Sequence, residues 1–122
     1  MGRFAQYKKR GTGPSPDQYP APVFGEDCGA VQEDARIAVS CGAIPAGADP
    51  VRVGIGFNAW NAANPDAIMS GVVVCDEGGD NFIDLPFEPD PGDTIKVVAR
   101  FIDLESNVPL SPQSAAQTIV WT

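Results

Sequence analysis

The amino-acid sequence predicts an all-β protein, a single antiparallel β-sandwich of about seven short strands behind an extended N-terminal arm. Three observations indicate this fold class. Short apolar runs that alternate with polar residues recur between turn signals, as half-buried strands do. The 122 residues include 13 glycines and 12 prolines, although 43% of the chain is hydrophobic, so the turn formers separate apolar segments. No long window shows helical periodicity. A closed barrel is the alternative, since strand number alone does not separate the two architectures.

The strands are expected in sequence between Gly, Pro and Asn-rich turns. Val23 and Phe24 form a first short run before an acidic turn. The later strands are expected at residues 34–41, 51–60, 68–75, 82–87, 94–103 and 116–122. The apolar faces of the three strands that alternate most clearly consist of Ala35, Ile37, Val39, Cys41, Val51, Val53, Ile55, Phe57, Ala59, Ile95, Val97, Ala99 and Phe101. Gly54 and Gly56 fall inside a strand, where glycine permits close packing or a bulge.

The turns have recognisable chemistry. We expect turns or loops at residues 42–50, 61–66, 76–80, 90–93 and 106–114. The segment 61–66 contains Asn-Pro-Asp, which favours turn initiation, and 76–80 contains two glycines, as a hairpin-type loop does. Pro86 cannot donate to a ladder and indicates an edge strand or a bulge.

The N-terminal 22 residues differ from the rest in charge and in composition. Residues 1–10 contain four Lys/Arg and no acid, whereas residues 11–122 contain four Lys/Arg and sixteen Asp/Glu, a balance of −12. Residues 11–22 contain four prolines, which exclude a helix or a central strand. We therefore divide the chain into a basic, then Pro/Gly-rich arm, residues 1–22, and a sandwich, residues 23–122.

Several functional classes are disfavoured by composition. The chain has no histidine, so a Ser-His or Cys-His nucleophile pair is impossible, and it has no Gly-rich phosphate loop. We expect no enzymatic activity and no cofactor. The acidic body would repel nucleic acid. No apolar stretch reaches the roughly 18–20 residues of a membrane span, and no apolar segment of a signal peptide follows the basic residues.

Cys28, Cys41 and Cys75 are expected to be reduced, buried thiols, because their number is odd and no secretion signal is evident. One disulfide is the alternative, since Cys41 and Cys75 lie in separate strand candidates that can face each other across a core. A zinc site is not expected without histidine or a Cys-x-x-Cys pair.

Residues 81–122 resemble the C-terminal half of fibronectin type III and related immunoglobulin-like domains. In those domains an apolar strand leads through a Pro-Gly turn to a long alternating strand, and a Ser/Pro loop leads to the last strand. Residues 82–103 and 111–121 follow this order, with Pro91 and Gly92 at the turn. The resemblance extends over residues 23–122 and implies an immunoglobulin-like sandwich with residues 51–60 in the middle of the second sheet. The corner tyrosine and the early tryptophan of fibronectin domains are absent, and Ile95 stands near the tyrosine position.

A small sandwich of this kind with an extended arm is similar to the accessory virion proteins of tailed bacteriophages, which decorate heads or attach to tails. This resemblance implies a non-enzymatic structural protein, made in the host cytoplasm, not secreted, and oligomeric in a particle. The candidate binding residues combine positive charge with aromatic anchors, a mixture enriched at protein interfaces. They are Arg3, Phe4, Tyr7, Lys8, Lys9 and Arg10. The expected partner is an acidic protein surface: a capsid or tail protein, or the body of a neighbouring copy.

Other interpretations stay open. The arm is alternatively a solvated tail or a contact for nucleic acid. The sandwich is alternatively a recognition module that binds a glycan or a cell-surface ligand through the loops at 58–66 and 106–113. The acidic residues between Asp76 and Asp93 form a solvated rim or, alternatively, a calcium site. Trp60 and Trp121 are expected in core or rim packing rather than as a sugar platform.

Overall fold

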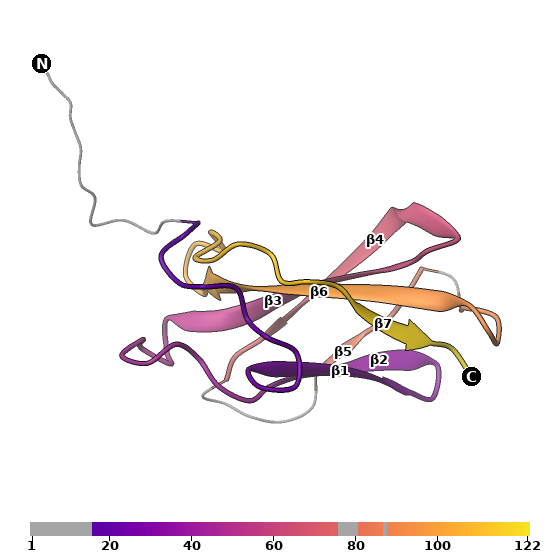
Figure 1. The fold of residues 1–122 in the computed structure, drawn as a ribbon, viewed down its shortest axis with the longest axis horizontal. Coiled ribbons are helices and arrows are strands. Elements are labelled where there is room, and N and C mark those ends of the chain that lie inside the picture. The colour runs from indigo at the N-terminus through magenta and orange to yellow at the C-terminus, as the bar shows by residue number, and fades with distance from the viewer. Residues whose placement is uncertain (1–15, 76–80, 87) are drawn as a thin grey trace, which may run out of the picture.

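The computed structural model describes residues 16–75, 81–86 and 88–122. These residues form an all-β sandwich of seven strands in two antiparallel sheets, which confirms the predicted fold class (Figure 1). The strands are β1 Cys28–Glu33, β2 Arg36–Cys41, β3 Val53–Asn61, β4 Asn64–Val73, β5 Asn81–Ile83, β6 Thr94–Asp103 and β7 Gln117–Val120. No helix occurs in this part of the chain.

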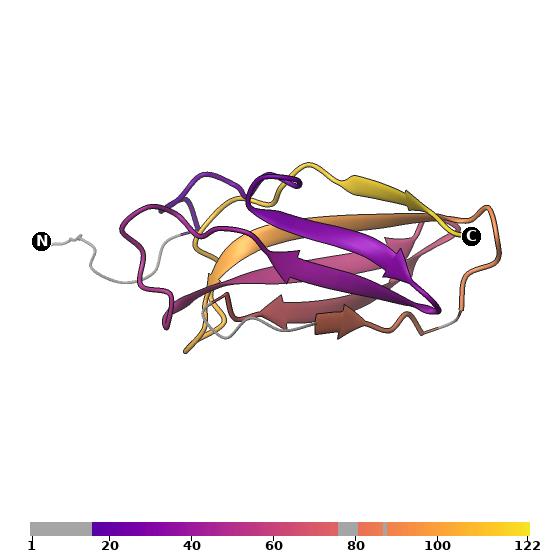
Figure 2. The same ribbon diagram turned by 90° about the horizontal axis from the view of Figure 1, so that it is seen from below.

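The two sheets contain three and four strands. One has the order β1-β2-β5 and the other the order β4-β3-β6-β7. The chain changes sheet between β2 and β3, between β4 and β5, and again between β5 and β6. Figure 2 shows the first sheet, with β1 and β2, stacked over the second. The strand expected at 51–60 is β3, which lies inside the four-stranded sheet as predicted.

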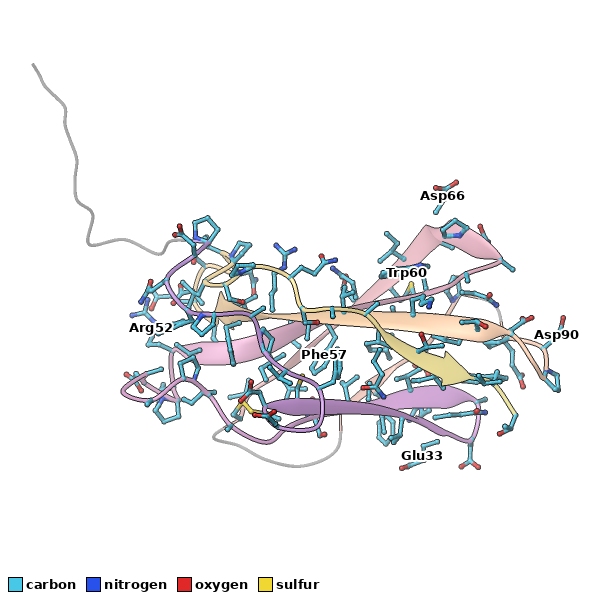
Figure 3. The ribbon with its side chains drawn as sticks, viewed as in Figure 1. Glu33, Arg52, Phe57, Trp60, Asp66 and Asp90 are labelled. Carbon is cyan, nitrogen blue, oxygen red and sulfur yellow. A yellow bond between two sulfur atoms is a disulfide. The ribbon has the colours of Figure 1, made fainter. Side chains whose placement is uncertain are left out.

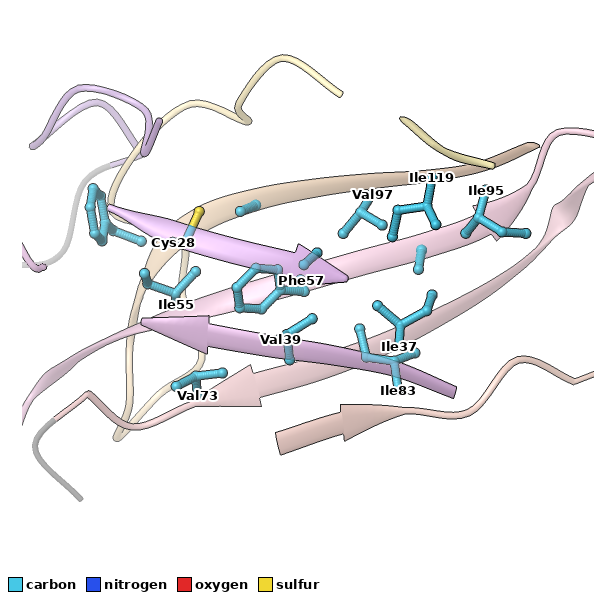
Figure 4. Close-up of a cluster of buried hydrophobic side chains, with 14 of the residues drawn as sticks. Cys28, Ile37, Val39, Ile55, Phe57, Val73, Ile83, Ile95, Val97 and Ile119 are labelled. Atoms are coloured by element: carbon cyan, nitrogen blue, oxygen red, sulfur yellow. The ribbon is translucent and has the colours of Figure 1, made fainter. Parts of the chain in front are cut away.

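The core is organised around the pair formed by β3 and β6. Nine residue pairs are in register along it, from Val53 opposite Asp103 to Asn61 opposite Ile95. The inward side chains of this pair and those of β2 are buried, as their alternation predicts (Figure 4). Phe57 is 1% exposed and lies at the centre of this cluster, facing the first sheet. Ile37, Val39 and Ile83 meet it from β2 and β5.

The outer face of β6 is less polar than an alternating strand requires. Val98 and Ile102 are buried although they point away from the core. Gly54 and Gly56 explain part of this burial, because their missing side chains leave room on the sheet surface. A Cβ at Gly56 would lie 3.2 Å from Cγ2 of Ile102, and one at Gly54 would lie 2.6 Å from Cδ2 of Leu104. The predicted close packing over these glycines is therefore confirmed.

Several element boundaries differ from the sequence-based expectation. β2 begins at Arg36 and β3 at Val53, so Ala35 and Val51, which were expected on the inward faces, lie outside the strands and are exposed. The first strand is β1, whereas Val23 and Phe24 precede it and Phe24 makes only an isolated bridge to Cys28. The segment 61–66 is mostly strand, because β4 begins at Asn64 and only two residues, Ala62 and Ala63, connect it to β3. Pro65 is tolerated there because β4 is an edge strand that pairs with β3 alone.

The loop expected at 76–80 lies outside the described residues. The strands that flank it belong to different sheets and are not paired with each other, so the hairpin expected there is wrong. The connection instead carries the chain from one edge of the sandwich to the other layer. Pro86 follows the short edge strand β5, in agreement with the expected edge position.

The expectation of three reduced thiols is also wrong for two of the cysteines. Cys41, at the end of β2, and Cys75, just after β4, form a disulfide with a Cα–Cα distance of 5.3 Å. The bridge connects the two sheets, because β2 and β4 belong to different layers. Cys28 is free and buried, as expected of a small apolar residue. Burial, with a contribution from the carboxylate of Asp27, raises the pKa of the Cys28 thiol to about 11.

Replacing both bridged cysteines, Cys41→Ala with Cys75→Ala, should lower the free energy of unfolding by about 3–4 kcal/mol, the loop-closure value for a bridge of this span. Urea unfolding with and without a thiol reductant measures the effect. The reductant should lower the stability of the wild-type protein and leave that of the double variant unchanged. Equal stability of the two proteins without reductant would contradict the bridge.

Candidate functional site

The six predicted binding residues, Arg3 to Arg10, lie outside the described residues. The structure does describe the root of the arm, residues 16–24, which joins the arm to the sandwich. Figure 1 shows this indigo segment beside the connection that leads from β6 to β7. The candidate site is therefore built from the root and from the surfaces that surround it.

The root is packed on the sandwich rather than extended from it. The backbone N–H of Tyr19 donates to the carbonyl of Leu110 at 2.9 Å, and the Tyr19 ring meets the Phe101 ring edge to face at 6.3 Å. Pro22 is fully buried. Phe24 lies against Phe57, with ring centroids 6.3 Å apart. The rings of Phe57 and Phe101 belong to the central strand pair, so the root is fixed to the most buried part of the core.

Two serines hold the connection from β6 to β7 against β6. Beyond Val97, β6 has no partner strand on this side, and its backbone would otherwise be left unpaired in a buried place. The N–H of Phe101 donates to the hydroxyl of Ser111, and the N–H of Ala99 donates to the hydroxyl of Ser114, both at 2.9 Å. Each hydroxyl in turn donates to the carbonyl of the next residue. These serines therefore complete the edge of β6 with side chains.

An apolar slot opens where the chain leaves this serine-held stretch. We call it the edge slot; it lies between residues 21–25 of the root and residues 114–117, which lead into β7. Its volume is about 620 Å³. Val23, 48% exposed, lies on one wall, and the small side chains of Ala115 and Ala116 lie on the other. The slot separates two backbone segments that follow the same side of the sandwich without pairing.

Acidic residues border the edge slot. Glu26 is exposed and follows Gly25 directly, and the carboxylate of Asp27 accepts a hydrogen bond from the N–H of Val23 at 2.8 Å. Gly25 has φ of 94° and lets the chain turn sharply after the slot. None of the residues 21–25 and 114–117 that line the slot carries a charge.

The loop beside the root is fixed by a buried carboxylate. Asp103 ends β6 with its side chain 7% exposed, and it accepts hydrogen bonds from the Ser106 hydroxyl at 2.6 Å and from the Ser106 N–H at 3.0 Å. The Arg52 guanidinium lies 3.1 Å from the same Asp103 carboxylate and 3.7 Å from the carboxylate of Glu105. The hydrogen bond from the Ser106 hydroxyl, helped by the Ser106 N–H and by Arg52 and opposed by desolvation, holds the pKa of Asp103 below its ordinary value.

The acidic residues at the other end of the sandwich do not form a metal site in the described chain. Asp93 accepts hydrogen bonds from the Asn61 amide at 3.0 Å and from the Asp90 N–H at 2.9 Å. These two bonds, the Asn61 bond first, lower the pKa of the Asp93 carboxyl. Within residues 16–75, 81–86 and 88–122 no three Asp, Glu or Cys side chains are grouped so that they could hold a metal ion. The calcium alternative therefore has no support from these residues.

The two tryptophans occupy different environments. Trp121 is 3% exposed and belongs to the core, as predicted. Trp60 lies opposite Lys96 in the register of β3 and β6, at a half-buried position on the outer face of the four-stranded sheet (Figure 3). The same face contains a shallow hollow of about 270 Å³, lined by side chains that include Asn58, Ser70 and Arg100. Asn107 and Pro109 reach this hollow from the second predicted recognition loop.

Comparison of the chain with protein-family models, with curated proteins and with solved structures finds no match in any of the three. In the part of the chain that the structure describes, no helix is long and apolar enough to cross a membrane. Function is therefore inferred from the geometry of the described residues and from the charge pattern of the sequence.

Sequence patterns did not identify the root contacts as part of the site. Tyr19 stands in a proline-rich segment that we assigned to the arm, and its packing against Phe101 depends on a tertiary contact. Ser111 and Ser114 stand in a segment expected to be a polar loop. Their spacing of three residues within a Ser/Pro stretch was the available signal, but it does not reveal which buried N–H groups need a partner.

Ser114→Ala should lower the free energy of unfolding by about 1–3 kcal/mol, because it leaves the buried N–H of Ala99 without a hydrogen bond. Ser70→Ala is a suitable control, since Ser70 is exposed and bonds only to Asn58 among the described residues. The control should change the stability by less than about 0.5 kcal/mol. Urea unfolding of both variants measures the difference. Equal effects would contradict the role of the Ser114 hydroxyl as the hydrogen-bond partner of the Ala99 N–H.

Asp103→Asn should reduce stability at neutral pH and lose this effect in acid. A carboxyl with a lowered folded pKa contributes stability above its unfolded pKa of about 3.9, and the contribution is lost as pH falls through the folded pKa. The difference between wild type and variant should therefore be constant from about pH 7 to 5 and shrink below about pH 4. Thermal unfolding across this range measures it. Asp66→Asn, at an exposed strand tip (Figure 3), is the control and should show no such trend.

Proposed function

We propose that this protein is a non-enzymatic structural component of a larger assembly, held there by its N-terminal arm. One observation carries the proposal: the arm is joined to the body through a root whose tyrosine and phenylalanine pack on the central strands. A root packed on the core in this way attaches the arm firmly to the folded body. A solvated tail would not need such a junction.

Charge defines the surface to which the arm binds. Residues 1–10 carry four positive charges and the rest of the chain a balance of −12, so the arm is complementary to acidic protein surfaces. Phe4 and Tyr7 provide apolar anchors among these charges. A nucleic acid is a poorer partner, because binding through the arm would bring the acidic body close to phosphates.

The assembly that fits this design is a virus particle, and the protein is a decoration or cement-like component on the head or the tail of a tailed phage. This part of the proposal rests on the resemblance of a small sandwich with an arm to such accessory proteins. The geometry adds that the arm root and the β6–β7 connection share one end of the sandwich (Figure 1), so the opposite end is free to project.

Charge reversal of the arm tests the proposal. Arg3→Glu, Lys8→Glu, Lys9→Glu and Arg10→Glu together should reduce incorporation into purified particles at least tenfold, because the arm then repels an acidic surface. The matched control keeps each charge and exchanges the side chain: Arg3→Lys, Lys8→Arg, Lys9→Arg and Arg10→Lys. Quantitative mass spectrometry of gradient-purified particles measures the occupancy. Full occupancy of the reversed variant would refute anchoring by the arm.

A truncation can provide the same test only if it stops before the root. Removal of residues 1–15 leaves the packed residues in place, whereas removal of residues 1–22 would also delete Tyr19 and the buried Pro22. The shorter deletion should therefore retain the stability of the body and lose its place in the assembly.

A second candidate function is ligand recognition by the outer face of the four-stranded sheet. The observation that favours it is the hollow over Gly56, to which both predicted recognition segments contribute: Asn58 from one and Asn107 from the other. The Ser70 hydroxyl donates to the side-chain amide oxygen Oδ1 of Asn58 at 2.6 Å, and the Arg100 guanidinium donates to the side-chain amide oxygen of Gln113 at 2.8 Å. Both bonds place polar groups beside apolar side chains. A glycan array decides between the functions: binding that survives the arm reversal and is lost in Arg100→Ala favours recognition.

A further inference from the structure

The edge slot lies beside an unfilled position at the edge of the four-stranded sheet. β7 is the last strand of this sheet and pairs only with β6. The N–H of Trp121 donates to Asp93, and Gln117 and Ile119 are in register with alternate residues of β6. In an antiparallel pair alternate residues bond to the partner, so Ala116 and Thr118 turn their N–H and C=O groups away from β6. An extended chain in the slot could bond to these groups.

Among the described residues the neighbouring sheet contacts this edge through side chains. The Gln117 amide donates to the carbonyl of Ala30 at 2.7 Å. Just beyond β7, the Gln32 side chain of β1 donates to the carbonyl of Thr122 and accepts from its N–H, both at 3.0 Å. Among the described residues no backbone hydrogen bond connects 114–117 with 21–25. The root is packed on the core through Tyr19 and Phe24, and the slot lies between residues 21–25 of this root and residues 114–117.

The basic part of the arm, residues 1–10, has the chemistry to fill the slot. A chain that adds to a sheet edge bonds through its backbone N–H groups, and a proline on the bonding side removes one of them, so a proline-free segment suits this role best. Residues 1–10 contain no proline, whereas residues 11–22 contain four. The first ten residues also contain two aromatic side chains, Phe4 and Tyr7, for an apolar slot. The cations of this segment can face the acidic border of the slot, where the Glu26 carboxylate has no partner among the described residues.

We propose that the edge slot binds residues 3–10 of a second copy of this chain, which add alongside β7 as an extra strand and connect the copies head to tail. This inference rests on the proposed function, since it names the acidic partner of the arm as the body of a neighbouring copy. Side chains of an extended segment alternate, so Phe4 and Tyr7 point to opposite sides. One of them enters the slot and the other covers its rim.

The spacer favours a neighbouring copy over the chain's own slot. Five residues, 11–15, separate Arg10 from Pro16, where the described chain begins. To reach its own slot the chain would have to reverse within this stretch. Pro14 and Pro16 bias the residues before them, Gly13 and Ser15, toward extended conformations. The slot of a neighbouring copy can be reached without such a reversal, which favours the neighbouring copy.

Zero-length crosslinking of the full-length protein tests whether the added strand comes from the same chain or from a second copy. Equal amounts of ¹⁴N- and ¹⁵N-labelled protein are mixed and treated with a carbodiimide, which joins amines to carboxylates in direct contact. Peptides that join Lys8 or Lys9 to Glu26 or Asp27 are expected, and about half of them should combine the two isotopes. Crosslinks only within one isotope would show that the arm occupies its own slot, and no such crosslink would show that the slot is not its site. Either result overturns the inference.

A complementation experiment with two variants tests the geometry. Phe4→Ser with Tyr7→Ser disables the arm, and Ala116→Lys blocks the slot with a repelling charge at an exposed position. Each variant alone should sediment as a monomer at concentrations at which the wild-type protein forms oligomers. Their equimolar mixture should form dimers and nothing larger, because one functional arm and one functional slot remain.

The control for the blocked slot is Ala63→Lys, which introduces the same charge in the exposed turn between β3 and β4 and should assemble as the wild type does. Assembly of Ala116→Lys at wild-type strength, or a mixture that stays monomeric, would overturn the inference. Its failure is distinguishable from failure of the proposed function. If the charge-reversed variant loses particle occupancy and the wild-type protein does not self-associate, the anchoring role stands. Only the neighbouring copy is then removed as the partner of the arm.

Discussion

The ladder between β3 and β6 is the constraint on which the rest of the structure depends. Its nine residue pairs present Ile55, Phe57 and Phe101 to the core without a polar interruption. β4 and β7 add to its two sides, the three-stranded sheet packs across it, and the arm root is placed by ring contacts with two of its phenylalanines. The position of the arm root, residues 16–24, is therefore set by the core.

The edge slot arises from the same ladder, because β6 is longer than its outer partner β7. Where the pairing stops, Ser111 and Ser114 replace the missing strand with hydroxyl groups, and residues 115–116 stand away from the root. An edge completed by side chains costs little stability but leaves backbone groups of β7 open to another chain. Natural sheets rarely leave a long edge in this state. Here the open part is short and bordered by Glu26 and Asp27, which favours the basic segment proposed as its occupant.

The strands were predictable where one periodicity decides the outcome. In β3 and β6 the alternation fixes which side chains are buried. β6 spans the predicted residues, whereas β3 begins two residues later than predicted and leaves Val51 exposed. Prediction failed where tertiary contacts override local preference: β4 extends through Pro65 because β3 offers it an edge, and β1 forms in a sequence that contains Gly29 and two polar residues because β2 pairs with it. The disulfide and the slot depend on which segments meet across the layers, and no pattern within one segment encodes that.

The position of Cys28 has a consequence for oxidation of the chain. In the register of β1 and β2 it lies directly opposite Cys41, the same residue that is bonded to Cys75. Attack of a Cys28 thiolate on the Cys41 sulfur would release Cys75 as a thiolate and move the bridge into one sheet, which would leave the two layers without a disulfide between them. Thiol exchange requires the thiolate, and burial keeps Cys28 protonated with a pKa of about 11. A folded core thus protects the cross-layer bridge from its own third cysteine, whereas a chain oxidised before the core closes has no such protection.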